Sequence, residues 1–400
     1  MRTSAGSSCS DLNVQLFGES RLSDMARHWR FAIVGVGVVG EWHVRVLSRM
    51  ENATLAAVCD VNPAQPAKAF EKNKITGVPV YTDIHEMLRK EQIDVVTVAT
   101  PSGDHFTPAT VAMEAGKHTF TEVPAATTVE GCHRLVGTSE RTGRHCVIME
   151  NCCYFRNAMM VLNMVRHGLF GEMLHGEAGY QHYRIAQNVF DDHGNLLWCG
   201  EEEARRNGNL YPTHAVGPVG QWLNINRGDR FDYLVSVSGK SRGLNLYAAE
   251  HFGPDHPLTR REYALGDINT TLIKTVNGCT ITLYHDTQAP RPYDLIYRAQ
   301  GTKGLYMGTL DKIFIQGRSK GDTWETLEGY SEFEHPLWKA LATRAEGTGH
   351  GGADFIMLQR LIRCFQTGTY PDMDVYDAAD WSVIAPLSEQ SVAQRGRSVD

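Results

Sequence analysis

The sequence predicts an α/β domain with a doubly wound parallel sheet, followed by an α+β domain with an open, mostly antiparallel sheet and helices on one face. Short apolar strands alternate with helices over residues 30–150, a pattern typical of parallel sheets. A glycine-rich turn follows the first of these strands at once. Over residues 151–400, strands succeed one another with little helix between them. Residues 1–29 are polar and irregular, and we treat them as an N-terminal extension outside the fold.

Composition limits the class of protein. The chain has 400 residues, of which 42% are hydrophobic and 21% charged, so it is long enough for two large cores. A net charge of −7 without any basic stripe argues against nucleic-acid binding. No apolar run approaches the roughly 20 residues that span a bilayer, so no membrane segment is expected. We expect a soluble protein, either cytoplasmic or exported after the loss of a leader, with its nine scattered cysteines reduced.

The first predicted strand, Phe31–Val34, is short, apolar and rich in branched side chains, as a buried parallel strand should be. The turn Gly35–Gly40 separates it from a predicted helix over Glu41–Met50, and the strand Thr54–Cys59 comes next. The alternation then continues to residue 149. Further strands are expected at Val78–Tyr81, Val95–Ala99, His118–Thr121 and His145–Met149, and further helices at Pro66–Lys72, Ile84–Lys90, Phe106–Ala115 and Val129–Arg141.

The second domain begins with a predicted amphipathic helix, Asn157–His167, and strands dominate after it. Asn277-Gly278 lies between two alternating runs and predicts a tight hairpin, because both turn positions need positive φ. Helices return at the C-terminus. The expected strands are Met173–His182, Phe231–Ser238, Ile268–Val276, Thr280–His285, Leu305–Met307 and Lys312–Gln316, and the expected C-terminal helices are Phe355–Gln366 and Val375–Gln394.

The glycine-rich turn predicts a dinucleotide site. Gly35, Gly37 and Gly40 form a Gly-x-Gly-x-x-Gly motif between a buried strand and a helix, which is the setting of a Rossmann fold. The first glycine permits the turn, the second lets the pyrophosphate approach, and the third lets helix and strand pack closely. Asp60 ends the next strand, where a carboxylate accepts from the adenosine ribose and repels a 2′-phosphate. The predicted cofactor is therefore NAD.

Three later segments also follow predicted strands: Thr100–His105, Glu122–Pro124 and Glu150-Asn151. Because ligands bind at the carboxyl edge of such sheets, we expect these segments near the cofactor. No cluster of His, Cys or carboxylate residues has the spacing of a metal site, and no metal is expected.

Two short motifs and several longer ones point to a family. Glu122-Val123-Pro124 and Leu210-Tyr-Pro-Thr-His214 resemble motifs of the glucose-fructose oxidoreductase / inositol dehydrogenase superfamily, but that superfamily usually has Lys at the first site and Asp at the start of the second. Both departures argue against an ordinary sugar dehydrogenase. From about Arg30 to the C-terminus the chain instead resembles the NAD-dependent α-N-acetylgalactosaminidases of glycoside hydrolase family 109. The motifs that carry this resemblance are Asn207–His214, Asn224–Tyr233, Gly266–Asn269, Pro290–Tyr293, His350–Gly352 and Met373–Ala378.

The resemblance implies particular contacts. The family also holds its sugar with an arginine, whose position here is Cys199 by ungapped register, with Arg205 or Arg206 as substitutes after a local shift. The implied cofactor contacts are Val38, Val39, Asp60, Ser102, His105, Glu122, Val123 and Asn151, and the implied sugar contacts are Tyr180, Tyr211, Pro212, Thr213, His214 and Tyr293.

The implied activity is removal of terminal N-acetylgalactosamine by oxidation, elimination, addition and reduction. NAD⁺ takes a hydride from C3 of the sugar, a base removes the acidified C2 proton, and the aglycone leaves from C1. Water then adds to C1 and the hydride returns to C3. Histidine titrates near neutral pH, so His214 is the predicted catalytic acid/base. We expect Tyr180, Tyr211 and His182 to assist it, and Tyr293 to bind the sugar.

Two other functions fit the same fold. A net NAD-dependent sugar or cyclitol dehydrogenase would accumulate NADH, and Val123 in place of Lys argues against it. A catalytically silent sugar or nucleotide sensor would bind NAD without turnover, and the intact set of Tyr and His residues argues against it. By analogy with the superfamily, the second sheet could form the face of a homo-oligomer.

Overall fold

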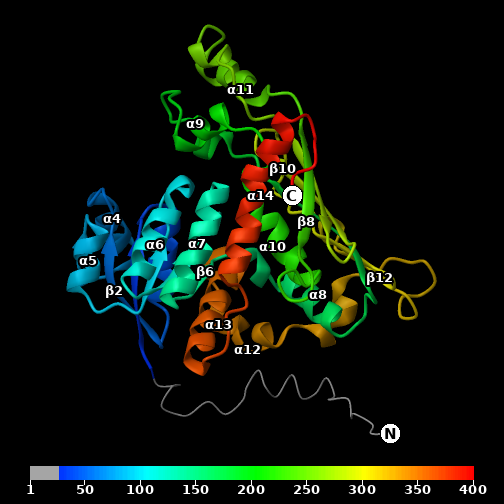
Figure 1. Cartoon of the computed structure of the whole chain (residues 1–400), viewed down its shortest axis with the longest axis horizontal. Coiled ribbons are helices and arrows are strands. Elements are labelled where there is room, and N and C mark those ends of the chain that lie inside the picture. The colour runs from blue at the N-terminus through cyan, green and yellow to red at the C-terminus, as the bar shows by residue number, and fades with distance from the viewer. Residues whose placement is uncertain (1–26) are drawn as a thin grey trace.

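The structure is a computed structural model that describes residues 27–400. Two domains lie side by side in Figure 1, and the long C-terminal helix α14 (Val375–Ala393) runs between them. The predicted N-terminal extension, residues 1–29, falls almost wholly outside the described residues, and Trp29 already belongs to the first strand.

The first domain is built on a six-stranded sheet in which every neighbouring pair is parallel. Its strand order, β3-β2-β1-β4-β5-β6, reverses between β1 and β4, which is where a doubly wound sheet binds its ligand. The predicted Rossmann fold is therefore confirmed. The strands are β1 (Trp29–Val34), β2 (Ala53–Cys59), β3 (Val80–Tyr81), β4 (Val95–Val98), β5 (His118–Thr121) and β6 (Cys146–Ile148).

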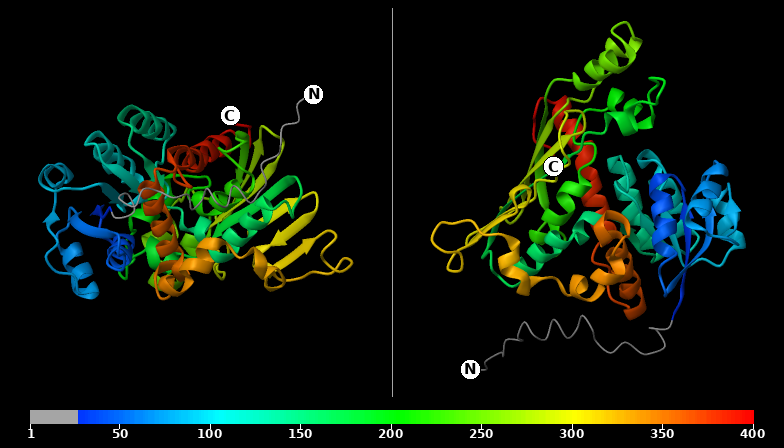
Figure 2. Two further views of the ribbon diagram at one scale, coloured as in Figure 1. Left: turned by 90° about the horizontal axis from the view of Figure 1, so that it is seen from below. Right: turned by 180° about the vertical axis from the view of Figure 1, so that it is seen from behind.

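Helices cover both faces of this sheet (Figure 2). The predicted boundaries hold with small shifts. The first helix starts at Val38 rather than Glu41, because Gly37 already has extended backbone angles and forms the N-cap. The helices are α3 (Val38–Leu47), α4 (Ala64–Asn73), α5 (Ile84–Lys90), α6 (Phe106–Glu114) and α7 (Val129–Thr142), with short turns η1 (Ser102–Asp104) and η2 (Asn151–Tyr154) after β4 and β6.

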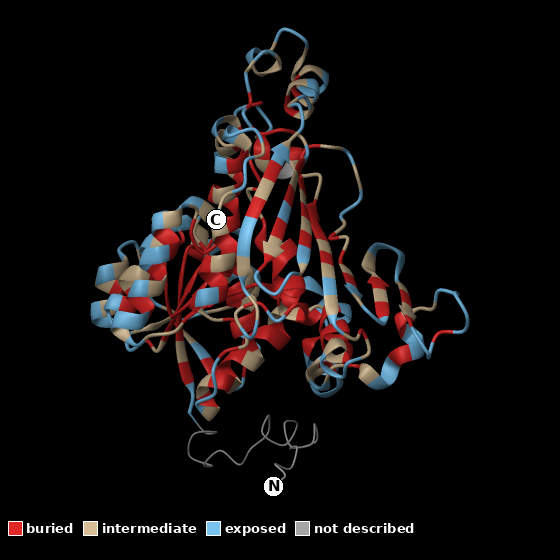
Figure 3. Cartoon of the chain, turned by 45° about the vertical axis from the view of Figure 1, so that its right-hand side comes forward, coloured by how far each residue is buried: buried red, intermediate tan, exposed pale blue. Residues whose placement is uncertain are grey.

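The second domain contains a seven-stranded sheet in the order β13-β12-β11-β7-β10-β9-β8. Only β7 and β10 pair in parallel; the other neighbours are antiparallel, as predicted. Buried and exposed residues alternate along the long strands (Figure 3), so one face packs against helices and the other is open. The strands are β7 (Met173–Gln181), β8 (Phe231–Ser238), β9 (Asn269–Thr275), β10 (Thr280–Asp286), β11 (Arg298–Gly301), β12 (Gly304–Met307) and β13 (Lys312–Ile315).

The hairpin predicted at Asn277-Gly278 joins β9 to β10 in antiparallel register. Its turn differs from the prediction, because Gly278 has a φ of 97° while Asn277 is not among the residues with positive φ. One glycine is therefore enough to close this turn.

The prediction of little helix between the strands is wrong. α10 was missed because it contains three residues of low helix propensity, Gly217, Pro218 and Gly220, whereas its packing against β7 and α8 stabilises it. The helices of this domain are α8 (Arg156–Arg166), α9 (Trp198–Arg205), α10 (Thr213–Trp222), α11 (Gly243–Phe252), α12 (Pro336–Ala345), α13 (Ala353–Thr367) and α14, with short turns η3 (Ile185–Val189), η4 (Pro257–Thr259), η5 (Gly308–Leu310), η6 (Leu327–Phe333) and η7 (Gly349–Gly352).

Helix α14 fixes the two domains relative to each other. It packs against α7 on one side and against β8 on the other. The Ser382 hydroxyl of α14 also accepts a hydrogen bond from the backbone N–H of Ala125, at 2.9 Å. Because Ala125 follows β5, this contact holds the carboxyl edge of the first sheet next to the second domain.

Candidate active site

The glycine-rich turn has the shape that a dinucleotide needs. Gly35 has a φ of 87°, and a Cβ there would lie 2.6 Å from the Ala99 carbonyl carbon. A Cβ on Gly37 would meet no atom within 4 Å, so the space above the N-terminus of α3 is open. Asp60 accepts from the backbone N–H of Val36 at 2.7 Å, which ties the end of β2 to the turn. These residues fit the pyrophosphate and ribose of NAD.

Replacing Gly37 with valine is expected to separate folding from cofactor binding. The side chain would enter open space, so the melting temperature of the cofactor-free protein should stay within about 2 °C of wild type. The same side chain would occupy the approach to the pyrophosphate, and we expect NAD affinity to fall roughly 30-fold, as overpacking does elsewhere. Fluorescence titration with NADH measures the second effect, and unchanged affinity would contradict the placement of the cofactor.

The other predicted cofactor contacts lie at the same edge of the sheet. Val38 is 72% exposed at the start of α3, and Val123 is buried. The His105 ring is buried too, with its nitrogens 2.6 Å from the Thr100 carbonyl oxygen and 2.8 Å from that of Pro124. His105 therefore links two strand-end loops. The remaining predicted contacts follow β1, β4, β5 and β6 in turn: Val39, Ser102, Glu122 and Asn151.

Sequence reasoning missed three residues at this edge. His43 of α3 lies 2.7 Å from the Glu122 carboxylate. Asn151 donates to Asp354 at 3.0 Å, and Asp354 is paired with His350 at 2.9 Å. Burial opposes ionisation of Asp354, but the bond with His350 outweighs it and lowers the pKa of that carboxyl. The signal for His350 was present, since it opens the His-Gly-Gly motif, whereas nothing local distinguished His43.

The predicted sugar contacts form one aromatic cluster. The Tyr180 ring, at the end of β7, has its centroid 4.6 Å from that of Tyr211 and 5.4 Å from that of His214. The Tyr293 ring lies 4.8 Å from the His182 ring. Burial raises the pKa of Tyr180, so its hydroxyl keeps its proton at neutral pH. These five rings come from three segments that are distant in sequence, and the fold brings them together.

A short chain of hydrogen bonds passes through Tyr180. Arg184 donates from Nη1 to the Tyr180 hydroxyl at 3.3 Å, and that hydroxyl lies 3.2 Å from Nδ1 of His182. Burial and the positive charge of Arg184 lower the pKa of His182, so its ring is neutral and Nδ1 is able to accept. The Tyr180 hydroxyl therefore donates to Nδ1 of His182 when the ring proton of His182 lies on Nε2.

His214 is bonded to a buried carboxylate that the sequence did not single out. Its Nδ1 lies 2.9 Å from the carboxylate of Glu150, a side chain with no exposed surface, which also accepts from the backbone N–H of Cys152. Gly217 permits this approach, because a Cβ there would lie 2.7 Å from Cγ of Glu150. With Nδ1–H donated to Glu150, Nε2 of His214 is free to accept a proton.

The run that contains His214 enters a helix, although its proline would suit a turn. Pro212 is the N-cap of α10, Thr213 its first residue and His214 its second. Pro212 and Thr213 are both buried, and the Thr213 hydroxyl has no hydrogen-bond partner within residues 27–400. The helix therefore fixes the direction of the His214 side chain.

Glu150, Cys152 and His214 each place a ligand-type atom within 4.8 Å of the other two. This cluster is not apparent in the sequence, because His214 is far along the chain from Glu150 and Cys152. The hydrogen bond between Glu150 and His214 is enough to explain why these two side chains lie so close together. Burial and the Glu150 carboxylate raise the pKa of Cys152 well above its usual range, which disfavours the thiolate that a metal needs.

The substitutes considered for the arginine of the family do not reach the cluster. Arg206 pairs with Glu389 at 2.9 Å and with Glu202 at 3.1 Å, and Arg205 is exposed. Cys199 is buried, and its sulfur lies 4.0 Å from Nη2 of Arg184. Arg184 is the cation that faces this position.

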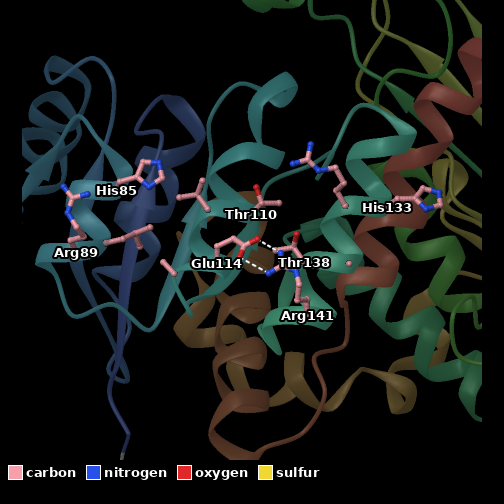
Figure 4. Close-up of a pocket in the computed structure, with 12 residues that line it drawn as sticks. His85, Arg89, Thr110, Glu114, His133, Thr138 and Arg141 are labelled. Carbon is pink, nitrogen blue, oxygen red and sulfur yellow. Dashed lines mark hydrogen bonds and ion pairs between the residues drawn. The ribbon is translucent and has the colours of Figure 1, made fainter.

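A groove of about 1000 Å³ lies elsewhere, between α5, α6 and α7 (Figure 4). Charged side chains line it, including Arg89 and His133, and Arg141 forms an ion pair with Glu114 across it. None of the predicted site residues lies in this groove, so it is separate from the aromatic cluster.

None of the helices within residues 27–400 is long and apolar enough to cross a bilayer. The eight cysteines of that part of the chain are all free, and seven of them are buried, as predicted for reduced core thiols.

Comparison with known proteins identifies both domains. Residues 29–150 match the family model described as "Oxidoreductase family, NAD-binding Rossmann fold", and residues 154–400 match that of "Glycosyl hydrolase 109, C-terminal domain". An alpha-N-acetylgalactosaminidase of Shewanella oneidensis is 44% identical, with 93% of this chain and 84% of the relative covered. A glycosyl hydrolase family 109 protein of another Shewanella strain is 45% identical, with 92% and 83% covered.

Solved structures share the fold at lower identity. An NAD-binding oxidoreductase from Klebsiella pneumoniae has a TM-score of 0.75 at 18% identity, covering 93% of this chain and 98% of its own. A levoglucosan dehydrogenase in complex with NADH has a TM-score of 0.74 at 19% identity, covering 94% and 99%. Fold and site together define an NAD-binding enzyme of the two-domain oxidoreductase type. The chain belongs to glycosyl hydrolase family 109, and it is a glycosidase built on an oxidoreductase fold.

Proposed function

We propose that this enzyme removes terminal N-acetylgalactosamine from α-glycosides, as the name of its Shewanella oneidensis relative states for that protein. The observation that carries the proposal is the pairing of His214 with Glu150 beside the ring of Tyr180. That pairing gives a base at the point where the aromatic cluster meets the carboxyl edge of the first sheet.

His214, Glu150 and Tyr180 have different roles in the proposed reaction. His214 receives the proton from C2 of the sugar at Nε2 and later returns it, while Glu150 holds Nδ1–H and stabilises the positive ring. With the sugar bound, Tyr180 donates its proton to an oxygen of the sugar in place of His182, while Arg184 continues to donate to the Tyr180 hydroxyl. NAD⁺, when bound, supplies a hydride acceptor at C3 that returns the hydride, so the overall reaction is a hydrolysis.

The cofactor is held by the residues predicted from the motif. Gly35, Gly37 and Gly40 admit the pyrophosphate, Val38 and Val39 lie at the start of α3, and Asp60 serves the ribose. The other proposed contacts are Ser102 and His105 after β4, Glu122 and Val123 after β5, and Asn151 after β6. Tyr180, Tyr211, Pro212, Thr213, His214 and Tyr293 form the proposed sugar site, with His182 assisting.

The test is hydrolysis of a chromogenic α-N-acetylgalactosaminide in heavy water. NMR of the released sugar should show deuterium at C2, because the C2 proton leaves to His214 and exchanges before it returns. Retention of the original proton would point to displacement by two carboxylates, which leaves C2 untouched. Accumulation of NADH with a free sugar would favour a dehydrogenase, and NAD binding without any turnover would favour a sensor.

We also propose that the open face of the second sheet joins two copies of the chain. Its strands expose large apolar side chains, which monomers rarely gather on one face. Sedimentation analysis should show a mass above 44.5 kDa. The exposed residues are Tyr233, Val237, Leu272 and Val276, with exposed fractions from 40% to 62%.

A further inference from the structure

Arg184 is a partly buried cation with no carboxylate hydrogen-bonded to it in the described part of the chain. No Asp or Glu oxygen within residues 27–400 lies within 4.0 Å of its guanidinium. Its only side-chain hydrogen bonds there go to two weak or neutral acceptors, the hydroxyl of Tyr180 and the sulfur of Cys199. A guanidinium has five N–H donors, so most of them are without a protein acceptor.

Glu203 attracts Arg184 electrostatically, but within residues 27–400 the two side chains form no hydrogen bond or ion pair. This buried carboxyl is bonded instead to Thr287 at 3.3 Å and to Gln288 at 3.1 Å. Burial raises the pKa of Glu203 to about 7, so its negative charge is incomplete at neutral pH. An arginine held away from water, with only a partly ionised carboxyl near it and most of its donors unbonded, is costly unless a ligand completes its hydrogen bonds.

The guanidinium lies against the proposed sugar site. Its central carbon is 5.8 Å from the centroid of the Tyr180 ring and 6.0 Å from that of Tyr211. The backbone is anchored, since the Arg184 N–H donates to the Thr287 carbonyl at 3.1 Å. Arg184 enters from the end of β7, and its tip reaches Cys199, where the resemblance to the family places an arginine from α9.

We propose that Arg184 is the sugar-binding cation of this enzyme, donating to an oxygen of the sugar, and that Cys199 is small because Arg184 occupies its space. This inference rests on the proposed function. An arginine that follows β7 would thus replace an arginine from α9 at the same place. The planar guanidinium has several N–H donors that suit a carbonyl or hydroxyl oxygen of the sugar. The rings of Tyr180 and Tyr211 lie close enough to attract its positive charge.

Three variants test this assignment. R184A should raise KM for the α-N-acetylgalactosaminide roughly 30-fold and change kcat less than about threefold, because a residue that binds the sugar throughout the reaction affects KM first. R184A/C199R should recover KM to within about fivefold of wild type, because the new arginine enters the vacated space. R261M is the control, since Arg261 pairs with Glu201 on the same α9 and should leave both constants unchanged.

A lower kcat with unchanged KM in R184A, without recovery in R184A/C199R, would overturn the assignment and make Arg184 a support for Tyr180 only. Calorimetric binding of free N-acetylgalactosamine to the NAD-loaded enzyme provides a readout that needs no turnover. Wild type that binds the sugar without hydrolysing its glycoside would refute the proposed function, and weaker binding by R184A would still support Arg184. Equal binding by both proteins would overturn the assignment of Arg184, and wild type that neither binds nor hydrolyses would overturn both proposals.

Discussion

Replacing His214 with asparagine is expected to lower kcat for the α-N-acetylgalactosaminide roughly 1,000-fold, within the range that positioned acid–base groups contribute. The asparagine amide is able to donate to Glu150 as Nδ1 does, so the buried carboxylate keeps its partner. What is lost is Nε2, the atom that we propose moves the C2 proton. Initial rates with purified protein measure the loss, and KM should change little.

The control for His214 is an exposed histidine in the loop that precedes α9. H193N leaves the site intact, because His193 is exposed and its backbone N–H, rather than its ring, bonds to Asp191. Both variants should bind NADH as wild type does, which separates lost chemistry from lost cofactor. An H214N enzyme that keeps more than a tenth of the wild-type kcat would remove His214 from its proposed role.

The cofactor half of the site could be predicted because its signals are local. Gly35, Gly37 and Gly40 stand in a fixed spacing after a buried strand, and Asp60 ends the next strand. Each follows from the pattern of about thirty consecutive residues in a βαβ unit. The parallel sheet that carries these residues could also be predicted, because strands and helices alternate along the sequence with short connections.

The substrate half required packing that the sequence does not show. Tyr180 and His214 were found through family motifs, but the carboxylate that orients His214 was not. Glu150 follows a strand of the first domain, 64 positions before His214, and only the docking of α10 brings the two together. The role of Arg184 was not predicted for the same reason. Its guanidinium lies near Cys199 only because η3 turns the chain back between β7 and α9.

Leu210 and Glu150 together explain a departure from the superfamily pattern. The superfamily places an Asp four residues before its histidine, and this chain has Leu210 there. Glu150 supplies a carboxylate to His214 from a different element. His214 therefore has a carboxylate partner although residue 210 is a leucine.

Replacing Glu150 with glutamine is expected to lower kcat roughly 100-fold, a loss typical of catalytic groups that are slightly misplaced. The amide is of the same size and is still able to accept from the Cys152 N–H. Its NH₂ group, however, is able to donate to Nδ1 of His214 and so favours the tautomer with the proton on Nε2. His214 would then lack the free lone pair that takes the C2 proton. KM should stay within about threefold of wild type, because Glu150 does not touch the sugar.

Nitrogen-15 NMR of the histidine rings tests this reason directly, since the two tautomers give different shifts at Nδ1 and Nε2. In wild type the His214 proton should lie on Nδ1, and in E150Q on Nε2. E140Q is the matched control, because Glu140 is exposed on α7, far from His214 in the sequence, and accepts from the Tyr376 hydroxyl. If E150Q lost activity because it unfolds, its melting temperature would fall, and its affinity for NADH would fall as well. A stable E150Q with the changed tautomer and the wild-type kcat would show that His214 does not act as the base.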